Sequence, residues 1–350
     1  MSGRNDAAGR VLMVGLPGPE LDAALRARLR RLAPGGVILF ARNLETPAHC
    51  RSLVEELRRT VDHPLLLAVD QEGGRVSRLG RWIGTTPSAA ALTRAGPEVT
   101  RRFAVATGRA LRATGFNLDF APVVDLGGAG AANGIGDRSF GDDPLQVTRL
   151  AGAFLDGLQE QGIAGCLKHF PGLGPTSVDS HETLPIAERT CEELLVRDLL
   201  PFRRLASRSP AVMVGHAHYP ALDPAPGVPA SLSAPIVSGL LRSRLGYRGL
   251  VASDDLEMGA IGPLDMQREA GARAIAAGCD LILYCAQLEL AEQARRAIER
   301  AAEVRREFDD RLRQAAATVA DFAGRWVAPS TPALAWDQAR LDLESFADLA

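Results

Sequence analysis

Eight short apolar runs, rich in Val, Ile and Leu, recur along the chain and are separated by stretches of helical pattern. The runs are continuous rather than alternately apolar and polar, which is typical of strands buried on both faces of a parallel sheet. Several of the stretches between them end at glycine, a common helix terminator. Strand and helix therefore alternate throughout the chain. The apolar runs begin at residues 11, 35, 65, 116, 163, 211, 249 and 281.

Eight such units predict an α/β fold, a closed (β/α)8 TIM barrel, ahead of a doubly wound open sheet. No G-x-G-x-x-G motif follows a strand, so the dinucleotide-binding form of the open sheet lacks its fingerprint. We expect one catalytic barrel domain over residues 1–326, with the helical pattern continuing through residues 289–326. The Pro-containing segment VAPSTPALAW then opens a C-terminal tail, residues 327–350, which we expect to carry a short appended helix.

The composition excludes several kinds of partner. The net charge is −2, so there is no basic excess for nucleic acid and no charge block for a membrane surface. The N-terminal apolar run is interrupted by Pro17 and is too short for an export signal, which predicts a cytoplasmic protein. For the oligomeric state, which the sequence does not determine, a monomer is slightly favoured. Neither a disulfide framework nor a zinc site is indicated, and a reducing compartment fits best, because the cysteines are scattered: Cys50, Cys166, Cys191, Cys279 and Cys285.

Polar, titratable side chains lie at the carboxyl ends of the apolar runs. In a (β/α)8 barrel these ends form one rim, where the active site lies. A buried carboxylate there is costly unless it is paired or used, so the set predicts an active site. For any single aspartate, the alternative is a helix N-cap. The set comprises Asp70, Asp119, Asp125, Lys168, His169, His216, His218, Asp254 and Asp255.

The segment KHFPGLGPTSVDSH, residues 168–181, places two histidines, a lysine and an aspartate on a stretch that its glycines and prolines keep out of helix and strand. Asp179 and His181 are two residues apart and point to the same side of an extended loop. The carboxylate can then hold one ring nitrogen and leave the other to exchange a proton, as a general acid requires. The segment therefore predicts a lid that brings this pair onto a bound substrate.

With these residues in view, the chain resembles glycoside hydrolase family 3, and within it the single-domain bacterial β-N-acetylglucosaminidases. The resemblance runs from about residue 10 to about residue 290 and implies a TIM barrel that needs no cofactor and no metal. Seven motifs carry it in this order: GGVILFARN, AVDQEGGRVSRL, FNLDFAPVVDL, GDRSFGDDP, KHFPGLGPTSVDSHETLP, AVMVGHAHYP and VASDDLEMGA.

The resemblance implies a role for each matched residue. Asp254 matches the nucleophile that forms a covalent glycosyl-enzyme, His181 matches the general acid/base and Asp179 matches its partner. A histidine thus replaces the second carboxyl group of the usual glycosidase pair. Two displacements at one carbon imply net retention of configuration. Sugar binding is implied for Asp70, Arg78, Arg138, Lys168 and His169.

The implied reaction is removal of non-reducing terminal GlcNAc from β-linked substrates by an exo-acting, retaining enzyme. The single-domain form, together with the predicted absence of export, resembles enzymes that act on muropeptides such as GlcNAc-1,6-anhydroMurNAc during cell-wall recycling. The sequence departs from the family pattern at two positions. Leu173 stands where the family usually has a histidine, and Pro175 where it has an acidic or small residue. Neither position carries the proton transfer.

Four alternatives remain open at the level of sequence. The same scaffold could serve a β-glucosidase, or a glycoside phosphorylase in which phosphate replaces water. A sugar-binding barrel without catalysis is a third, although Asp254, Asp179 and His181 are all present. The fourth is a metal-dependent barrel hydrolase, in which His216, His218, His169 and Asp254 would form the metal site.

Overall fold

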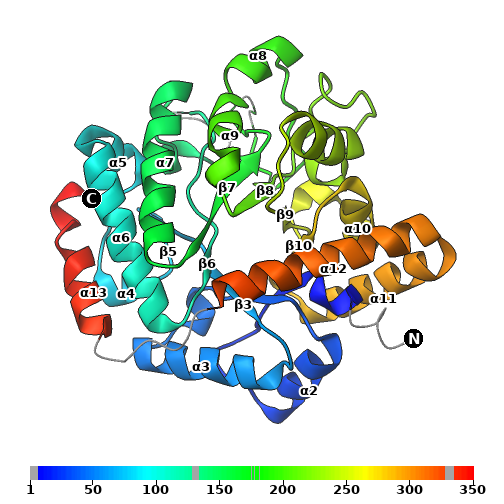
Figure 1. Cartoon of the computed structure of the whole chain (residues 1–350), viewed down its shortest axis with the longest axis horizontal. Coiled ribbons are helices and arrows are strands. Elements are labelled where there is room, and N and C mark those ends of the chain that lie inside the picture. Colours follow the sequence, from blue (N-terminus) through cyan, green and yellow to red (C-terminus); the bar gives the residue numbers. More distant parts are fainter. Residues whose placement is uncertain (1–6, 128–133, 175, 177, 181, 328–334) are drawn as a thin grey trace.

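The structure is a computed structural model and describes residues 7–127, 134–174, 176, 178–180, 182–327 and 335–350. All eight apolar runs form parallel strands, and these close into one barrel, which confirms the predicted (β/α)8 fold (Figure 1). The barrel strands are β1 (Leu12–Gly15), β2 (Gly36–Ile38), β3 (Leu66–Val69), β6 (Leu118–Asp119), β7 (Ala164–Phe170), β8 (Ala211–Val214), β9 (Leu250–Asp255) and β10 (Leu281–Tyr284).

The first and last strands pair with each other and close the sheet. Val14 of β1 lies opposite Val37 of β2 on one side and Tyr284 of β10 on the other. Because β1 has a hydrogen-bonded neighbour on each side, the sheet is a barrel and the alternative of an open doubly wound sheet is wrong. All carboxyl ends of the strands therefore lie on one rim.

Helices follow the strands and cover the outside of the barrel. The helices α3 (Pro47–Thr60), α6 (Pro97–Thr114), α7 (Pro144–Glu160) and α10 (Leu264–Ala277) lie in the stretches of helical pattern between the apolar runs. Helix α6 ends at Gly115, whose φ of 95° is the left-handed conformation that glycine adopts without strain. The shorter helical elements are α2 (Ala23–Leu32), η1 (Ala41–Asn43), α4 (Gly80–Ile83), α5 (Ala89–Ala95), η2 (Gly136–Arg138), α8 (Cys191–Val196), α9 (Leu200–Leu205), η3 (Ala206–Arg208), η4 (Ala230–Leu232), η5 (Pro235–Arg244) and η6 (Gly259–Ile261).

The helical pattern predicted over residues 289–326 is two helices rather than one. Helices α11 (Leu288–Val304) and α12 (Arg306–Trp326) are separated by Arg305, whose φ of −132° and ψ of 108° are extended. The break turns α12 across the amino-terminal mouth of the barrel (Figure 1). There its apolar face packs against side chains from the barrel interior, and the residues that do so include Val319, Phe322 and Ala323. Helix α12 thus closes the end of the barrel opposite the rim.

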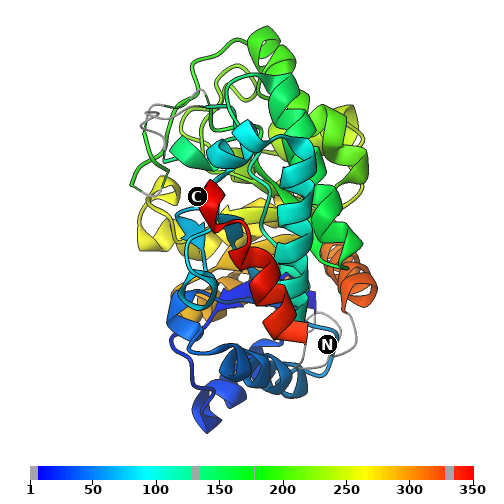
Figure 2. The ribbon, with the colours of Figure 1, turned by 90° about the vertical axis from the view of Figure 1, so that its left-hand side faces the viewer.

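Beyond residue 326, where the sequence predicts an appended tail, the described residues form helix α13 (Ala335–Glu344) and the short η7 (Ala347–Leu349). Helix α13 lies beside α6 (Figure 2). Two edge-to-face ring contacts hold this segment on the barrel, Trp336 on Trp82 and Phe346 on Phe103, each with ring centroids 5.5 Å apart. In the described ranges, none of the helices combines the length and the apolar character that crossing a bilayer would require.

Replacing Phe322 by alanine should lower the free energy of unfolding by about 3 kcal/mol, because a buried aromatic ring is lost from the barrel floor and a cavity is left. Urea unfolding followed by circular dichroism measures the change. Val304→Ala, on a side chain that is 79% exposed, is the matched control and should change the stability by no more than about 0.5 kcal/mol. Equal stability of wild type and Phe322→Ala would show that α12 is not part of the core.

Candidate active site

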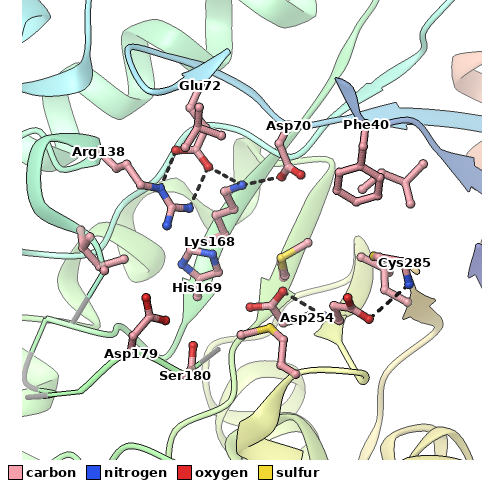
Figure 3. Close-up of a pocket in the computed structure, with 18 of the residues that line it drawn as sticks. Phe40, Asp70, Glu72, Arg138, Lys168, His169, Asp179, Ser180, Asp254 and Cys285 are labelled. Atoms are coloured by element: carbon pink, nitrogen blue, oxygen red, sulfur yellow. Dashed lines mark hydrogen bonds and ion pairs between the residues drawn. The ribbon is translucent and has the colours of Figure 1, made fainter. Parts of the chain in front are cut away.

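A cavity of about 350 Å³ opens at the carboxyl-terminal rim of the barrel (Figure 3). Its wall includes side chains from the ends of several strands, from the short hairpin formed by β4 (Gln71–Gly73) and β5 (Val76–Ser77), and from the loop that follows β7. His181 lies outside the described residues. The other seven candidate residues all line the cavity: Asp70, Arg78, Arg138, Lys168, His169, Asp179 and Asp254.

Asp254 lies at the end of β9 and faces the cavity. The backbone N–H of Asp255 donates to one of its carboxylate oxygens, Oδ1, at 2.8 Å. Burial alone would raise the pKa of Asp254. The nearby imidazoles of His169 and His216, the Asp255 N–H and the Lys168 ammonium outweigh burial and hold this pKa below its ordinary value. A partly buried carboxylate that stays ionised is suited to act as a nucleophile.

Lys168 lies at the centre of a buried network of charges. Its ammonium is 2.8 Å from Asp70 and 2.6 Å from Glu72. Arg138, in η2, forms two bonds to the same glutamate, each 2.8 Å long. Burial alone would raise the pKa of Glu72, but the charges of Lys168 and Arg138 hold it well below the ordinary value. Arg78 approaches Asp70 more distantly, at 3.7 Å.

The sequence prediction omits Glu72, although it is the acidic residue that joins Arg138 to Lys168. A sequence signal for it exists, because Glu72 follows Asp70 by two residues and such residues point to the same side of an extended chain. With Glu72 in place, the two cations are ionised and fixed in direction before any ligand enters. The geometry thus presents fixed donors and acceptors to the cavity.

Asp125 belongs to the set of strand-end residues predicted from the sequence, but the prediction gives it no role. It is fully buried after β6 and accepts the Nδ1–H of His169 at 2.7 Å, as well as the backbone N–H of His169 at 3.1 Å and that of Leu173 at 2.8 Å. This arrangement fixes the tautomer of the His169 ring, because a carboxylate can only accept. The sequence places Asp125 at a strand end but gives no sign that His169, 44 positions further on, is its partner.

The loop that follows β7 brings Asp179 and Ser180 to the cavity (Figure 3). Gly134, in a neighbouring loop, lies close to the Asp179 carboxylate. A Cβ atom added to Gly134, whose φ is +75°, would be only 2.5 Å from that carboxylate. That loop is itself held by Arg75, which pairs with Asp137 at 2.9 Å and donates to the carbonyl of Gly134. Asp179 therefore lines the cavity, while its role, its pairing with His181 and the lid movement remain predictions.

Leu173 is buried and forms part of the cavity wall close to Gly215. Its backbone N–H is one of the donors to Asp125, and its carbonyl accepts the hydroxyl of Thr176 at 2.7 Å. The departure from the family pattern at this position therefore leaves an apolar side chain at the site. Pro175, the other departure, lies outside the described residues.

The histidines of the metal alternative are engaged elsewhere. His216 has Nδ1 at 2.8 Å from the Ser231 hydroxyl and Nε2 at 3.0 Å from the backbone carbonyl of Asp255. His218 places Nδ1 at 3.3 Å from the carbonyl of Val228. Over the part of the chain that the structure describes, no three His, Cys, Asp or Glu side chains come together as a metal site would require. The arrangement offers no support for a metal centre.

An ionised carboxylate inside a pocket of fixed hydrogen-bonding side chains, on the rim of a TIM barrel, is an arrangement that a glycoside hydrolase can use. The sequence profile of the glycosyl hydrolase family 3 N-terminal domain matches residues 8–318. The chain therefore belongs to glycoside hydrolase family 3, as the sequence motifs predict.

Related proteins agree with this assignment. A protein named beta-hexosaminidase from Alkalilimnicola ehrlichii is 41% identical over 285 residues, which cover 78% of this chain and 80% of that protein. One of the same name from Pseudomonas aeruginosa is 40% identical over 294 residues, covering 83% and 86%. Among solved structures, a family 3 beta-N-acetylglucosaminidase from Paenibacillus sp. superposes with a TM-score of 0.90 at 34% identity, covering 99% of this chain and 68% of that one.

Asp255 gives a pH-dependent prediction. Burial, and next the charge of Glu257, raise the pKa of its carboxyl to about 7. Between about pH 4 and pH 7 the folded chain binds more protons at this group than the unfolded chain does, so its contribution to stability is lost as the pH rises. Asp255→Asn keeps an oxygen that accepts the N–H groups of Glu257 and Cys285, but it does not titrate. Wild type should therefore lose stability relative to Asp255→Asn as the pH rises through this window.

Urea unfolding of both proteins at several pH values between 4 and 8 measures this difference. Asp310→Asn, on an exposed aspartate of α12, serves as the control substitution and should follow wild type at every pH. A stability difference between wild type and Asp255→Asn that is the same at every pH would contradict the assignment.

Proposed function

We propose that the chain is an exo-acting, retaining β-N-acetylglucosaminidase. The observation that carries the proposal is Asp254, kept ionised in a cavity whose other polar groups are fixed by their own partners. The names of the related proteins support the preference for N-acetylhexosamines. The cavity is at the small end of the range for ligand pockets, which fits the removal of one terminal sugar at a time.

The proposed substrate-binding groups are Asp70, Arg78, Arg138, Lys168 and His169. Carboxylate oxygens accept from sugar hydroxyl groups, while guanidinium and ammonium groups donate to them. Arg78 can donate to a ligand through its guanidinium group, because it lines the cavity, is partly exposed and approaches Asp70 only at 3.7 Å. The ordered network around Lys168 means that little rearrangement accompanies binding, which favours affinity.

In the proposed first step, an oxygen of Asp254 attacks the anomeric carbon as the bond to the leaving group breaks. His181 donates its proton to the departing oxygen, and Asp179 orients the imidazole and stabilises its charged form. In the second step, His181 takes a proton from water, the water oxygen attacks the same carbon, and the Asp254 carboxylate leaves. Two inversions at one centre give a product with the configuration of the substrate.

We further propose that muropeptides carrying GlcNAc-1,6-anhydroMurNAc are the natural substrates and that the protein acts in the cytoplasm. The sequence motifs support the substrate, and free thiols support a reducing compartment: Cys50, Cys166, Cys191, Cys279 and Cys285 are all unpaired in the structure. We expect higher kcat/KM for such a muropeptide than for an N-acetylglucosamine disaccharide.

The substrate preference can be measured with the 4-nitrophenyl β-glycosides of GlcNAc and glucose. We expect kcat/KM for the GlcNAc compound to exceed that for the glucoside by at least about 100-fold. Equal or reversed values would indicate a β-glucosidase instead. Product analysis in phosphate buffer belongs to the same experiment, since release of GlcNAc 1-phosphate in place of GlcNAc would indicate a phosphorylase.

The roles of Asp254 and His181 can be separated by mutation. Asp254→Ala should lower kcat by roughly 10⁴-fold or more, because the nucleophile is lost. Added azide should restore turnover of an activated aryl glycoside and give the α-glycosyl azide, the product of one displacement. His181→Ala should slow substrates with poor leaving groups far more than those with good ones, since only the former need protonation. Wild-type turnover by Asp254→Ala would refute the nucleophile assignment.

A further inference from the structure

His216 is fully buried, and beyond its electrostatic effect on Asp254 the proposed mechanism gives it no task. Its ring is held on both sides, by the Ser231 hydroxyl at Nδ1 and by the Asp255 carbonyl at Nε2. Because a carbonyl only accepts, Nε2 carries a hydrogen. The serine hydroxyl can donate to Nδ1 or accept from it, so the bond to Asp255 persists whether the imidazole is neutral or protonated.

Asp255 is held at three points, and each of its polar groups has a partner. His216 donates to its carbonyl, while the N–H groups of Glu257 and Cys285 donate to its carboxylate at 3.1 and 3.2 Å. The remaining group, its backbone N–H, donates to Oδ1 of Asp254 at 2.8 Å. A residue fixed at its carbonyl and at its side chain directs its N–H along a fixed line. The orientation of the nucleophile therefore depends on how Asp255 is held.

We propose that His216 is a positioning residue for the nucleophile. Through the carbonyl of Asp255 it fixes the N–H that holds Oδ1 of Asp254, so that the other carboxylate oxygen is presented to the anomeric carbon. The proposal rests on the nucleophilic role of Asp254 given above. A displacement of about 1 Å in a reacting group can cost roughly 100-fold in rate, so a hydrogen bond two residues removed from the chemistry has a measurable effect.

Two substitutions of His216 separate the effect of losing its hydrogen bond from the effect of changing the side-chain volume. His216→Gln can place its amide nitrogen near the position of Nε2 and still donate to the Asp255 carbonyl. His216→Met has a similar length but no donor. The matched control lies two residues away, because His218 belongs to the same HAH motif, has Nδ1 at 3.3 Å from the Val228 carbonyl and does not line the cavity. His218→Gln and His218→Met are made alongside.

With 4-nitrophenyl β-GlcNAc, His216→Met should lower kcat roughly 10- to 100-fold, while His216→Gln recovers most of the loss. The inhibition constant of free GlcNAc should stay near the wild-type value in both, because the sugar-binding groups are untouched. The rate at which a 5-fluoro β-GlcNAc fluoride labels the Asp254 peptide, followed by mass spectrometry, should fall in step with kcat. Both His218 variants should match wild type.

Wild-type kcat in His216→Met would overturn the proposal, and so would equal losses in the Met and Gln variants or a loss of GlcNAc inhibition that parallels kcat. Ser231→Ala provides a second route if His216→Met fails to fold, since it removes one of the two anchors of the ring and should give a smaller loss of kcat. Failure of the wild type to cleave β-GlcNAc glycosides would refute the proposed function. The His216 comparison would then use the aryl β-glycoside that the wild type does cleave.

Discussion

The pairing of β1 with β10 is the constraint on which the site depends. Once the sheet closes, the carboxyl ends of all eight strands lie on one ring, and residues far apart in the sequence become neighbours. Asp70 and Lys168 are 98 positions apart and form an ion pair across this ring. An open sheet would spread the same strand ends along a line, and β3, β7 and β9 could not surround a single cavity.

The second organising fact is that the charges of the cavity are satisfied by one another before a substrate enters. Glu72 forms ion pairs with Lys168 and Arg138. Asp125 accepts hydrogen bonds from His169 and from the backbone of the loop that follows it, and Asp254 accepts one from a backbone N–H. Buried charges are tolerated when they are paired and hydrogen-bonded. The arrangement also leaves Asp254, the proposed nucleophile, ionised despite its partial burial, so one set of contacts stabilises the fold and supports the proposed chemistry.

The sequence predicts the barrel well because local patterns encode it. Each apolar run becomes a strand, and five of the nine polar residues predicted at the ends of the runs line one cavity: Asp70, Lys168, His169, Asp254 and Asp255. The other four, Asp119, Asp125, His216 and His218, are buried and do not line it. What it could not predict are pairings that only the closed barrel creates, such as Glu72 with Arg138 and Asp125 with His169, since neither partner carries a local mark of the other. The sequence also could not predict the break at Arg305, because the helical pattern is uninterrupted there and the turn follows from the packing of α12 on the barrel floor. The acid/base pair remains a prediction for a different reason, since His181 is outside the described residues.

The contact between Gly134 and Asp179 joins two loops that belong to different βα units of the barrel. Barrel enzymes are usually regarded as modular, with each rim loop free to vary on a constant scaffold. Here the space for the carboxylate of one loop exists only because the other has no side chain at the point of contact. The two loops are therefore sterically coupled: a side chain introduced at position 134 would displace the Asp179 carboxylate, so a loop exchange between relatives has to keep a glycine at this point of contact.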